Sequence, residues 1–570
     1  MPMVTKTSRG RAGCLTQGES ADATMRQPKM RSTATSRGAI SRPRRLPSRR
    51  SQLVAAGLAI AALVAGLVWA ASGDGSRRGG NHRQGGVFGA GTALGPGVRS
   101  ASRGTQPGAA STEAAVPLMP APRGRAVTVT VDTSHPGAAI PSDFLGLSFE
   151  ASALPKIASS TRRADLARLL RSLGQGTLRF GGVSADAQVA WSQRRPLPRW
   201  ASAAITERDL AGLATLAGQT GWSVLLTVNL GHYDATSAAQ EAAAAHALLG
   251  SKLAGIEIGN EPDRCFITRL RGAGWSFSAY RRQFHAYRAA IARAAPGVPI
   301  TGPDASSGER VLPWLRASAA LYPALLTDHY YPLSSCGYTP SVSDLLGPLI
   351  RRGESSMLSS LRAIQRSSAI PLRIDETNNV SCKGQPGVSN TFASALWAAD
   401  YTARAMTAGV RGLDFHDLIN RPGAYSPLVA RKDGLHANPE WYALLMAQRL
   451  AGSKALRATV HSAPNLTATA FLSAGGVVHI VLVNFDPAGG TPLLVRLRVP
   501  GRFAGGTILR LTAPSAYATS QVKLGGGEVK ASGTWSARLP LPGIYQRRGS
   551  LALSLPATSA ALVTLAPPGV

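Results

Sequence analysis

The sequence predicts an α/β fold in which a (β/α)8 barrel is followed by a C-terminal antiparallel β-sandwich domain. Between residues 126 and 451, eight short runs of β-forming residues alternate with segments whose apolar residues recur every three or four positions. This stretch has the usual length of such barrels, about 200 to more than 400 residues when the loops are long. From residue 452 to 570 the helical periodicity stops, and strand-like runs follow one another across glycine-rich turns.

The predicted barrel strands are residues 144–150, 177–182, 224–231, 255–261, 299–306, 325–332, 372–378 and 410–417. Helical segments between and after them include residues 161–174, 206–221, 278–297 and 438–452. The strands predicted in the sandwich are residues 465–473, 477–486, 492–500, 505–514 and 550–567. A strand at 126–133 has no partner before the barrel, so it is a candidate for the sandwich. An open doubly wound sheet is the alternative to the barrel, disfavoured because no glycine-rich phosphate turn follows the first strand.

The formal net charge of +32 raises the question of nucleic-acid binding, but the distribution of the charge argues against it. Residues 1–52 hold 12 Lys or Arg against 2 acids, and residues 73–125 hold 7 against 2. These flanks lack apolar periodicity, and no aromatic-rich basic motif accompanies the charge, so we expect no nucleic-acid partner. We interpret residues 1–52 as a basic cytoplasmic tail and residues 73–125 as a flexible linker.

An uncharged apolar stretch, Leu53 to Ala71, lies between these flanks. At about 1.5 Å per residue it nearly crosses a hydrocarbon core of about 30 Å, and the arginines before it hold the N-terminus in the cytoplasm. The sequence therefore predicts a transmembrane anchor at residues 53–72 and a single-pass cell-membrane protein with its folded domains outside. The alternative is a cleaved signal segment, with Val68 and Ala70 at the cleavage site, and a secreted protein.

Polar residues gather where the predicted barrel strands end, and in this fold the carboxyl ends of the strands carry the active site. Glu150 ends the first strand, Asn260 and Glu261 end the fourth, and Glu376 ends the seventh. Further candidates at strand ends are Asp186, Asn229, His232, Asp263, Asp304, His329, Tyr330, Tyr331, Asp414, His416 and Asp417.

Glu261 and Glu376 stand out because strands four and seven lie on opposite sides of a ring of eight. Glycoside hydrolysis requires such a pair, in which one carboxyl donates a proton and the other attacks the anomeric carbon. Ionising one acid raises the pKa of its neighbour, so a close pair divides these roles. A helix cap and a structural ion pair are the alternative interpretations. Deeper in their strands, Glu257 and Arg179 are interpreted as a buried ion pair, because either alone would be costly to bury.

Four motifs resemble those of glycoside hydrolase family 79, the heparanase and bacterial β-glucuronidase group. They are LRFGGVSAD, IGNEPD, HYYP and ETNNVSCKGQPGVSNTFASALWAADY, which begin at residues 178, 258, 329 and 376. The GNEP motif recurs in many retaining barrel glycosidases, whereas the long run after ETN is far more specific. The similarity covers residues 126–570.

The resemblance implies a retaining exo-type β-glycosidase, first a β-glucuronidase, that needs no metal or cofactor and acts on a β-linked glycan or glycoside. It implies that Glu261 is the acid/base, Glu376 the nucleophile, and Asn260 a partner of the sugar 2-hydroxyl. It also implies that Tyr330 hydrogen-bonds the nucleophile and that Glu150 binds outer hydroxyls. The remaining candidates for substrate binding are Ser184, Tyr331, Ser381, Lys383 and His416.

One loop departs from the pattern of uronate-specific members, in which a Tyr and glycines shortly after the nucleophile present N–H groups to the sugar carboxylate. Here Ser381 stands near the expected Tyr, and Cys382 and Lys383 replace glycine. Either the larger residues close the pocket to a carboxylate, or Lys383 supplies a positive charge instead. The alternatives are therefore a β-glucosidase of the same family and, from another class, a non-catalytic glycan-binding envelope protein.

Of the four cysteines, Cys14 falls in the basic tail and three fall in the barrel region. Cys336 and Cys382 follow strands six and seven, whose loops should be neighbours, so a disulfide between them is favoured. Cys265, just after the GNEPDR sequence, is the competing partner.

Overall fold

The computed structural model describes residues 123–264, 270–272, 274–321, 323–503, 505–544, 546–547 and 550–569. The predicted tail at 1–52, the apolar segment at 53–72 and the linker up to residue 122 lie outside the described residues. Cys14 and Cys265 lie outside them as well.

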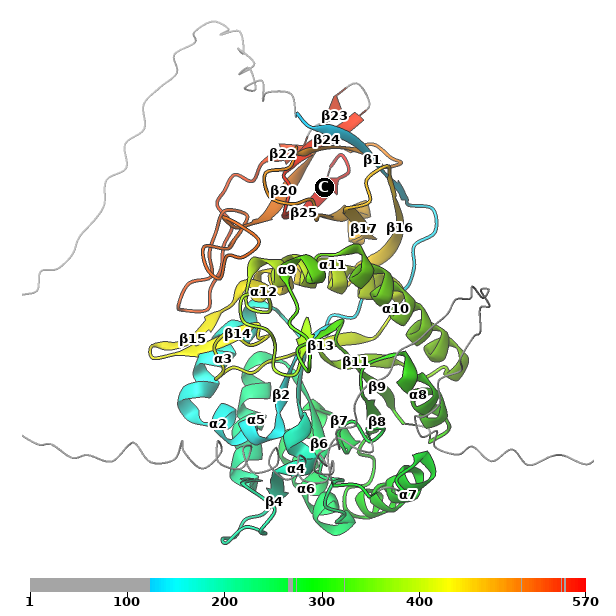
Figure 1. The fold of residues 1–570 in the computed structure, drawn as a ribbon, viewed down its shortest axis with the longest axis vertical. Helices are drawn as coiled ribbons and strands as arrows, with labels where there is room; N and C mark the ends of the chain where they lie inside the picture. The colour runs from blue at the N-terminus through cyan, green and yellow to red at the C-terminus, as the bar shows by residue number, and fades with distance from the viewer. Residues whose placement is uncertain are drawn as a thin grey trace, which may run out of the picture. The chain divides into compact units, whose positions relative to one another are not determined.

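Within the described residues, eight parallel strands close into a barrel in the order β11, β13, β2, β3, β6, β7, β8, β9 (Figure 1). Their bounds are Leu145–Glu150 (β2), Thr177–Gly181 (β3), Ser223–Val228 (β6), Leu253–Ile258 (β7), Ile300–Ala305 (β8), Leu325–Tyr330 (β9), Leu372–Thr377 (β11) and Gly412–His416 (β13). Each strand coincides, within two residues at its start and three at its end, with one of the eight predicted runs. The barrel predicted from the sequence is therefore confirmed.

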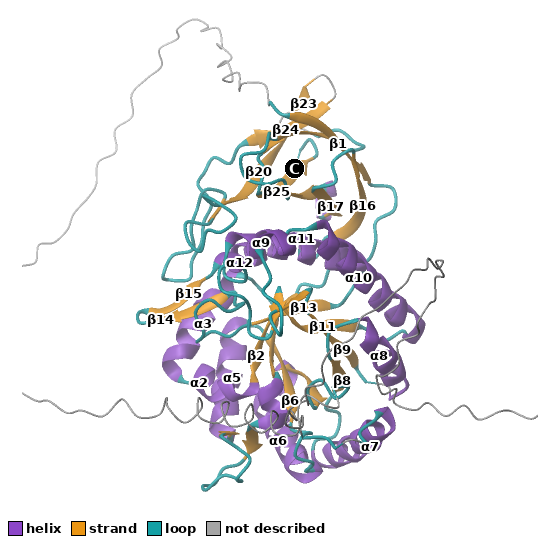
Figure 2. Ribbon diagram, in the orientation of Figure 1, coloured by secondary structure: helices purple, strands orange, loops and turns teal. Residues whose placement is uncertain are grey.

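Helices surround the barrel strands (Figure 2). Their bounds are Leu154–Ala158 (α2), Ser160–Ser172 (α3), Val183–Ala187 (α4), Glu207–Thr220 (α5), Ala235–Leu249 (α6), Phe277–Ala294 (α7), Leu312–Ser318 (α8), Val342–Leu345 (α9), Pro348–Ser368 (α10), Phe392–Ala408 (α11) and Pro439–Ala447 (α12). Helix α5 shows why these segments fold as predicted. Thr206 and Asp209 form a capping box at its start, and Gly221 ends it in the left-handed conformation.

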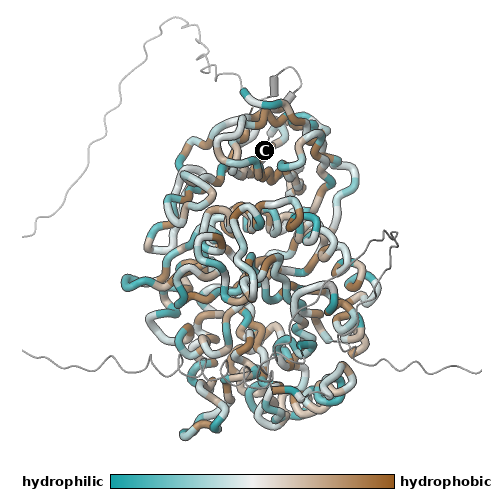
Figure 3. The backbone as a smooth tube through the Cα atoms, in the orientation of Figure 1, coloured by the Kyte–Doolittle hydropathy of each residue, from teal (hydrophilic) through white to brown (hydrophobic). Residues whose placement is uncertain are grey.

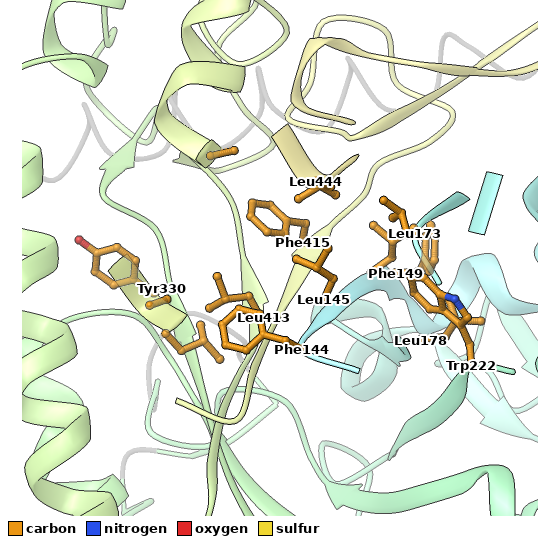
Figure 4. Close-up of a cluster of buried hydrophobic side chains, with 14 of the residues drawn as sticks. Phe144, Leu145, Phe149, Leu173, Leu178, Trp222, Tyr330, Leu413, Phe415 and Leu444 are labelled. Carbon is orange, nitrogen blue, oxygen red and sulfur yellow. The ribbon is translucent and has the colours of Figure 1, made fainter. Parts of the chain in front are cut away.

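The helices bury their apolar faces against the outer faces of the strands. Figure 4 shows part of this core, in which Phe149, Leu178 and Trp222 are fully buried. Burying side chains of this size stabilises the fold by about 1.5–3 kcal/mol each. By contrast, the tip of the hairpin formed by β14 (Leu428–Arg431) and β15 (Gly434–Ala437) is strongly hydrophilic (Figure 3).

Short strands pair in the loops around the barrel. They are Val189–Trp191 (β4) with Ala203–Ile205 (β5), and Leu333–Ser334 (β10) with Val380–Ser381 (β12). The second pair joins the loops after β9 and β11, so it holds together the two loops that follow strands six and seven of the barrel.

A second sheet, of eleven strands in the described part of the chain, forms the C-terminal domain. Its strands are Arg125–Asp132 (β1), Lys454–His461 (β16), Leu466–Leu472 (β17), Val478–Asn484 (β18), Leu493–Arg498 (β19), Gly505–Thr512 (β20), Lys523–Leu524 (β21), Gly543–Ile544 (β22), Gln546–Arg547 (β23), Ser550–Leu555 (β24) and Ser559–Ala566 (β25). The sheet curls so that apolar residues of distant strands, such as Val129, Ile480 and Leu553, share one core.

Strand β1 precedes the barrel in the sequence, yet it belongs to this sheet and lies between β16 and β19. It runs antiparallel to β16 but parallel to β19, so the sheet is not purely antiparallel as predicted. Strand β16 was not predicted. Its alternate residues are exposed or half-buried along most of its length, which leaves a weak apolar signal in the sequence.

Helix α11 links the two domains and directly follows the loop after β11. Its first amides, of Phe392 and Ala393, donate to the carbonyls of Ala518 and Ala516 in the C-terminal domain. These bonds satisfy the helix start, where Thr391 makes no side-chain cap. The helix is buried nearly all round because it also packs against β17 and β18.

No helix in the part of the chain that the structure describes is long and apolar enough to span a membrane. The prediction of a single-pass cell-membrane protein is corrected on this finding. The stretch to which the anchor was assigned is not among the residues described.

Candidate active site

The two predicted catalytic acids lie at the same end of the barrel and face one histidine. His329, near the end of β9, places its Nδ1 3.2 Å from Oε1 of Glu261 and 3.9 Å from Oε1 of Glu376. The separation of these two carboxylate oxygens therefore cannot exceed the sum of those two distances. Both side chains keep a small exposed fraction, 14% for Glu261 and 11% for Glu376, so the pair is accessible from solvent.

The backbone brings Glu261 into this position by an unusual turn after β7. Gly259 and Glu261 both have positive φ, 79° and 45°. The amide of Glu261 donates to the carbonyl of Asp304 at the end of β8, at 2.9 Å. The strand therefore stops before Gly259, and residues 259 to 261 form a turn that is hydrogen-bonded to the neighbouring strand β8.

Arg179 occupies the centre of the barrel beneath the pair, fully buried. Its pairing with Glu257 at 3.0 Å confirms the predicted buried ion pair. The guanidinium reaches further, to carboxylate oxygens of Asp304 at 2.6 Å, Asp375 at 3.1 Å and Glu376 at 2.7 Å. It also donates to the side-chain oxygen of Asn260. One cation therefore orients five residues that belong to or follow three strands, β7, β8 and β11.

The charges around Glu376 keep it ionised. Burial alone would raise the pKa of Glu376, but His416, His329 and Arg179 outweigh burial and lower the pKa from 4.5 to about 2. Burial would lower the pKa of His329, yet the carboxylates around it, of Glu376, Asp304 and Glu261, raise that pKa well above 6.5. His329 is therefore a cation at neutral pH, and Glu376 an anion.

Tyr331, and not Tyr330, hydrogen-bonds Glu376, which corrects the role predicted for Tyr330. The hydroxyl of Tyr331 donates to Oε1 of Glu376 at 2.9 Å. Tyr330, the last residue of β9, points toward the helix layer (Figure 4). Its ring stacks on that of Tyr401 in α11, with ring centroids 5.7 Å apart. Adjacent residues of a strand face opposite sides, so only one of the two tyrosines can reach the site.

His416 and Glu150 extend the site toward the end of β2. The two ring nitrogens of His416 lie 3.7 Å from Glu376 and 3.9 Å from Glu150. Burial would lower the pKa of His416, but these two carboxylates raise it above 6.5. Glu150 also accepts the amide of Ser184 at 2.9 Å. The close approach requires Gly182, where a Cβ would lie 2.7 Å from the Glu150 carboxyl.

Asn260 is buried beside Glu261, and both ends of the residue are held. Its side-chain oxygen accepts from Arg179 at 3.0 Å, and its amide donates to Asp186 at 3.1 Å. Asp186 also accepts the amides of Leu230 and Gly231, so it supports the loop after β6. Asp263 and Asp417 accept loop amides in the same way, whereas Asp414 lies within β13 and pairs with the Arg373 guanidinium of β11.

The loop that was compared with the uronate-binding loop is fixed in place by the disulfide Cys336–Cys382, as predicted. Ser335 adds three hydrogen bonds, from its hydroxyl to the carbonyls of Ser381, Cys382 and Gly384. The carbonyl of Ser381 therefore accepts a hydrogen bond from within the loop region. The side chain of Lys383 is exposed and makes no hydrogen bond or ion pair with any described residue.

This loop approaches the site through Tyr425, a residue that carried no signal in the sequence. Gly384, with φ of 85°, lies so close that a Cβ there would be 2.5 Å from the amide of Tyr425. The Tyr425 ring in turn lies 5.6 Å from that of Tyr331 and 5.8 Å from that of His416. A continuous chain of contacts thus connects the loop, through Tyr425, to Tyr331 and His416.

Asp304, His329 and Asp375 form a group of possible metal ligands among the described residues, with ligand atoms within 4.8 Å of one another. Both oxygens of Asp304 are engaged, by Arg179 at 2.6 Å and by His329 at 3.0 Å. The Arg179 guanidinium supplies the positive charge that a metal would bring. The donor set therefore does not fit a metal ion.

Sequence reasoning missed the part that Asp375 plays in this cluster. It stands one residue before Glu376 in LRIDET and would be expected on the opposite face of β11. The pairing of β11 with β9 and β13 shifts register between Ile374 and Thr377, which marks an irregularity that a strict alternation could not predict.

No family model matches the chain. A β-glucuronidase from Neurospora crassa is 29% identical over 136 residues, so the match spans 21% of this chain and about a quarter (24%) of that enzyme. The solved 4-O-α-L-rhamnosyl-β-D-glucuronidase of Fusarium oxysporum 12S, in complex with Rha-GlcA, superimposes with a TM-score of 0.65 at 20% identity over 77% of this chain and 100% of that one.

The predicted resemblance to β-glucuronidases is confirmed. Other barrel glycosidases share the fold at lower similarity. An arabinofuranosidase of glycoside hydrolase family 51 from Xanthomonas axonopodis pv. citri gives a TM-score of 0.57 at 15% identity and covers 77% of this chain and 99% of that one. An α-L-arabinofuranosidase from Thermotoga maritima gives 0.56 at 16%, with the same coverage.

Proposed function

We propose that this protein is a retaining exo-acting β-glycosidase that removes a terminal β-linked sugar, first of all a β-D-glucuronide. The observation that carries the proposal is the pair of acids facing one imidazole, of which Glu376 is held ionised at neutral pH. A binding protein needs no such pair, whereas glycoside hydrolysis does.

Glu376 is the proposed nucleophile. Each of its oxygens accepts one hydrogen bond, Oε1 from Tyr331 and Oε2 from Arg179, which fixes the plane of the carboxylate. A low pKa keeps the group charged and ready to bond to the anomeric carbon. The negative charge is lost as that bond forms, and an oxocarbenium-like transition state is passed.

Glu261 is the proposed acid/base. Arg179 contacts four carboxylates but is not within ion-pair distance of Glu261, whose ring and guanidinium partners are instead His329 at 3.2 Å and Arg264 at 3.4 Å. In the first step Glu261 gives its proton to the glycosidic oxygen, the alcohol leaves, and Glu376 bonds to the sugar. In the second step Glu261 takes a proton from water, whose oxygen displaces Glu376 and releases the sugar.

A glucuronide is proposed over a neutral sugar because one feature of the site suits a carboxylate and because the relatives point the same way. Lys383 is a cation without a partner among the described residues, on a loop that reaches the site through Gly384 and Tyr425. The two most informative relatives are also named as glucuronidases. Asn260, locked by Arg179, is the proposed partner of the 2-hydroxyl.

The test is hydrolysis of 4-nitrophenyl β-D-glucuronide and of the matching β-D-glucoside by the full chain. We expect turnover of the glucuronide first, with the β-anomer as the first product seen by proton NMR. Glu376→Gln should fall below detection, and azide should restore activity to Glu261→Ala by replacing water in the second step. Glu528→Gln, an exposed acid of the C-terminal domain, is the matched control. Full activity of Glu376→Gln would overturn the assignment of Glu376 as the nucleophile. Faster hydrolysis of the glucoside than of the glucuronide would overturn the choice of a glucuronide as the substrate.

A further inference from the structure

A hollow apart from the acid pair opens near the carboxyl ends of β3 and β6. Its volume is about 420 Å³, within the range of about 300–1,000 Å³ usual for small-molecule sites. It lies where β4, α4 and α6 come together, and these elements are side by side in Figure 1. We call it the aromatic pocket. Its lining residues include Trp191, Trp200, Asn229, His232, Tyr233 and Glu241, none of which bonds to either proposed catalytic acid.

Glu241, on α6, is the unusual member of this lining. Its exposed fraction is 5%, and it has no hydrogen bond or ion pair to any residue the structure describes. Its two oxygens are nevertheless not sealed in the core, as one oxygen of Glu257 and one of Glu440 are, so they open to the pocket that the residue lines. A buried carboxyl without a partner is costly, and a ligand in the pocket would supply the partner.

Other polar side chains of the lining are already engaged. The side-chain amide of Asn229 donates to the carbonyl of Asp186, and the hydroxyl of Ser237 donates to Asp234. Asp234 also accepts the amides of Thr236 and Ser237. Asp234, and not a ligand anion, therefore occupies the start of α6. The buried carboxyl is the acidic group left for a ligand.

Aromatic rings form the walls of the pocket. Trp200 stacks on His232 with ring centroids 3.9 Å apart and planes 13° from parallel, which holds the indole in place. Trp191 is half-buried at the end of β4, and Tyr233 is 54% exposed. The faces of Trp and Tyr rings attract cations, those of Trp most strongly. The walls therefore suit a cation that carries apolar substituents.

The charge of the pocket also favours a cation. None of its described lining residues is Lys or Arg, whereas Asp234 and Glu241 are acids. Burial would raise the pKa of Asp234, but hydrogen bonds from the start of α6 lower it, so Asp234 is an anion at pH 7. Burial lowers the pKa of His232, although Asp186 opposes this, and the ring is neutral. An anionic ligand would find no counter-ion, and a neutral one would leave both acids without a counter-charge.

Glu241 is protonated at pH 7 because it lacks a counter-ion. Burial raises its pKa to about 8, and no described charged group contributes to this shift, His232, Tyr233 and Asp234 of the lining included. A ligand cation beside the carboxyl would favour the ionised form, as any close opposite charge does. The proton then passes to the buffer, so binding of a cation and release of a proton are linked.

We propose that the aromatic pocket binds a small organic cation, an ammonium group with apolar substituents, whose charge pairs with Glu241 and whose substituents lie against Trp191 and Trp200. The pocket encloses enough volume for one such molecule. Binding here is separate from the reaction at Glu261 and Glu376, so each can be tested without the other.

The test titrates the full chain with choline and with 3,3-dimethyl-1-butanol, which has the shape of choline without its charge, and follows tryptophan fluorescence. Choline should bind at least about 5-fold more tightly than the alcohol. Glu241→Gln, which keeps the shape of the side chain, should remove that preference, and Trp200→Ala should weaken choline binding. Glu528→Gln, an exposed acid of the C-terminal domain, is the matched control and should bind as the wild type does. Melting temperatures show which variants are folded.

Calorimetry of the wild type in two buffers, phosphate and Tris at pH 7, counts the protons released and needs no variant. From a pKa of about 8, about 0.9 proton should leave for each choline bound. No binding of choline, or equal or tighter binding of the alcohol, would overturn a cation site. Binding without proton release, or a preference for choline that persists in folded Glu241→Gln, would overturn the pairing with Glu241.

Discussion

Two adjacent tyrosines offer a controlled test of how the nucleophile is held. The Tyr331 hydroxyl donates to Glu376 at 2.9 Å, whereas the Tyr330 hydroxyl has no hydrogen-bond partner among the described residues and its ring belongs to the core. A hydrogen bond to a charged group is worth about 1.5–3 kcal/mol. Tyr331→Phe removes that bond, leaves the ring, and frees one of the two oxygens that define the carboxylate plane.

We therefore expect Tyr331→Phe to lower kcat/KM for 4-nitrophenyl β-D-glucuronide by about 10- to 150-fold, which is that free energy expressed as a rate. Tyr330→Phe should stay within about twofold of the wild type, because it removes an unpaired hydroxyl. Initial rates at saturating and limiting substrate, with melting temperatures of both variants, give the comparison. Equal losses in the two variants, or a larger loss in Tyr330→Phe, would refute the assignment of Tyr331.

Three further predictions concern charge. The folded state lowers the pKa of Glu376 from 4.5 to about 2, so its carboxylate stabilises the fold above pH 4.5 and that contribution is lost as pH falls toward 2. The stability advantage of the wild type over Glu376→Gln, from urea unfolding, should narrow by about 1.5 kcal/mol between pH 6 and pH 3.5, and a constant difference would contradict it. Arg179→Met should cost at least about 3–5 kcal/mol by the same method, because it strands buried carboxylates, and a neutral effect would exclude Arg179 as the organising cation. Lys383→Ala should reduce kcat/KM about 2- to 5-fold for the glucuronide and not for the glucoside. Lys454→Ala is its control, and equal effects on both sugars would remove Lys383 from carboxylate binding.

Much of the barrel could be predicted because its sequence signals are local. Each strand is a short apolar run that ends in polar residues, and that ending marks the end of the barrel where the site lies. Cys336 and Cys382 could be paired because loops after neighbouring strands must themselves be neighbours. Glu261 and Glu376 could be placed together for the same reason, since both end strands of one ring.

What could not be predicted depends on side-chain direction and on contacts between distant segments. The choice between Tyr330 and Tyr331 turns on a single step of strand alternation, and the sequence motif contains both. Asp375 enters the cluster through an irregularity of β11 that no periodicity reveals. Tyr425 comes from a loop without regular structure, and only the contact at Gly384 shows that it borders the site.

The acids around Arg179 differ in pKa, although the same guanidinium contacts each of them. Glu257 and Asp375 are fully buried, and burial together with neighbouring carboxylates raises the pKa of each. Glu376 is bound by the same guanidinium, yet it lies at the rim, where His329 and His416 add positive charge that the deeper acids do not share, and its pKa falls. A nucleophile must be ionised, whereas buried carboxylates crowded together repel one another and are stabilised when some of them are protonated. Their raised pKa values favour the protonated forms of Glu257 and Asp375, whereas Glu376 at the rim and Asp304, which also contacts His329, favour the anion. The buried cluster therefore supports the reaction without touching the substrate.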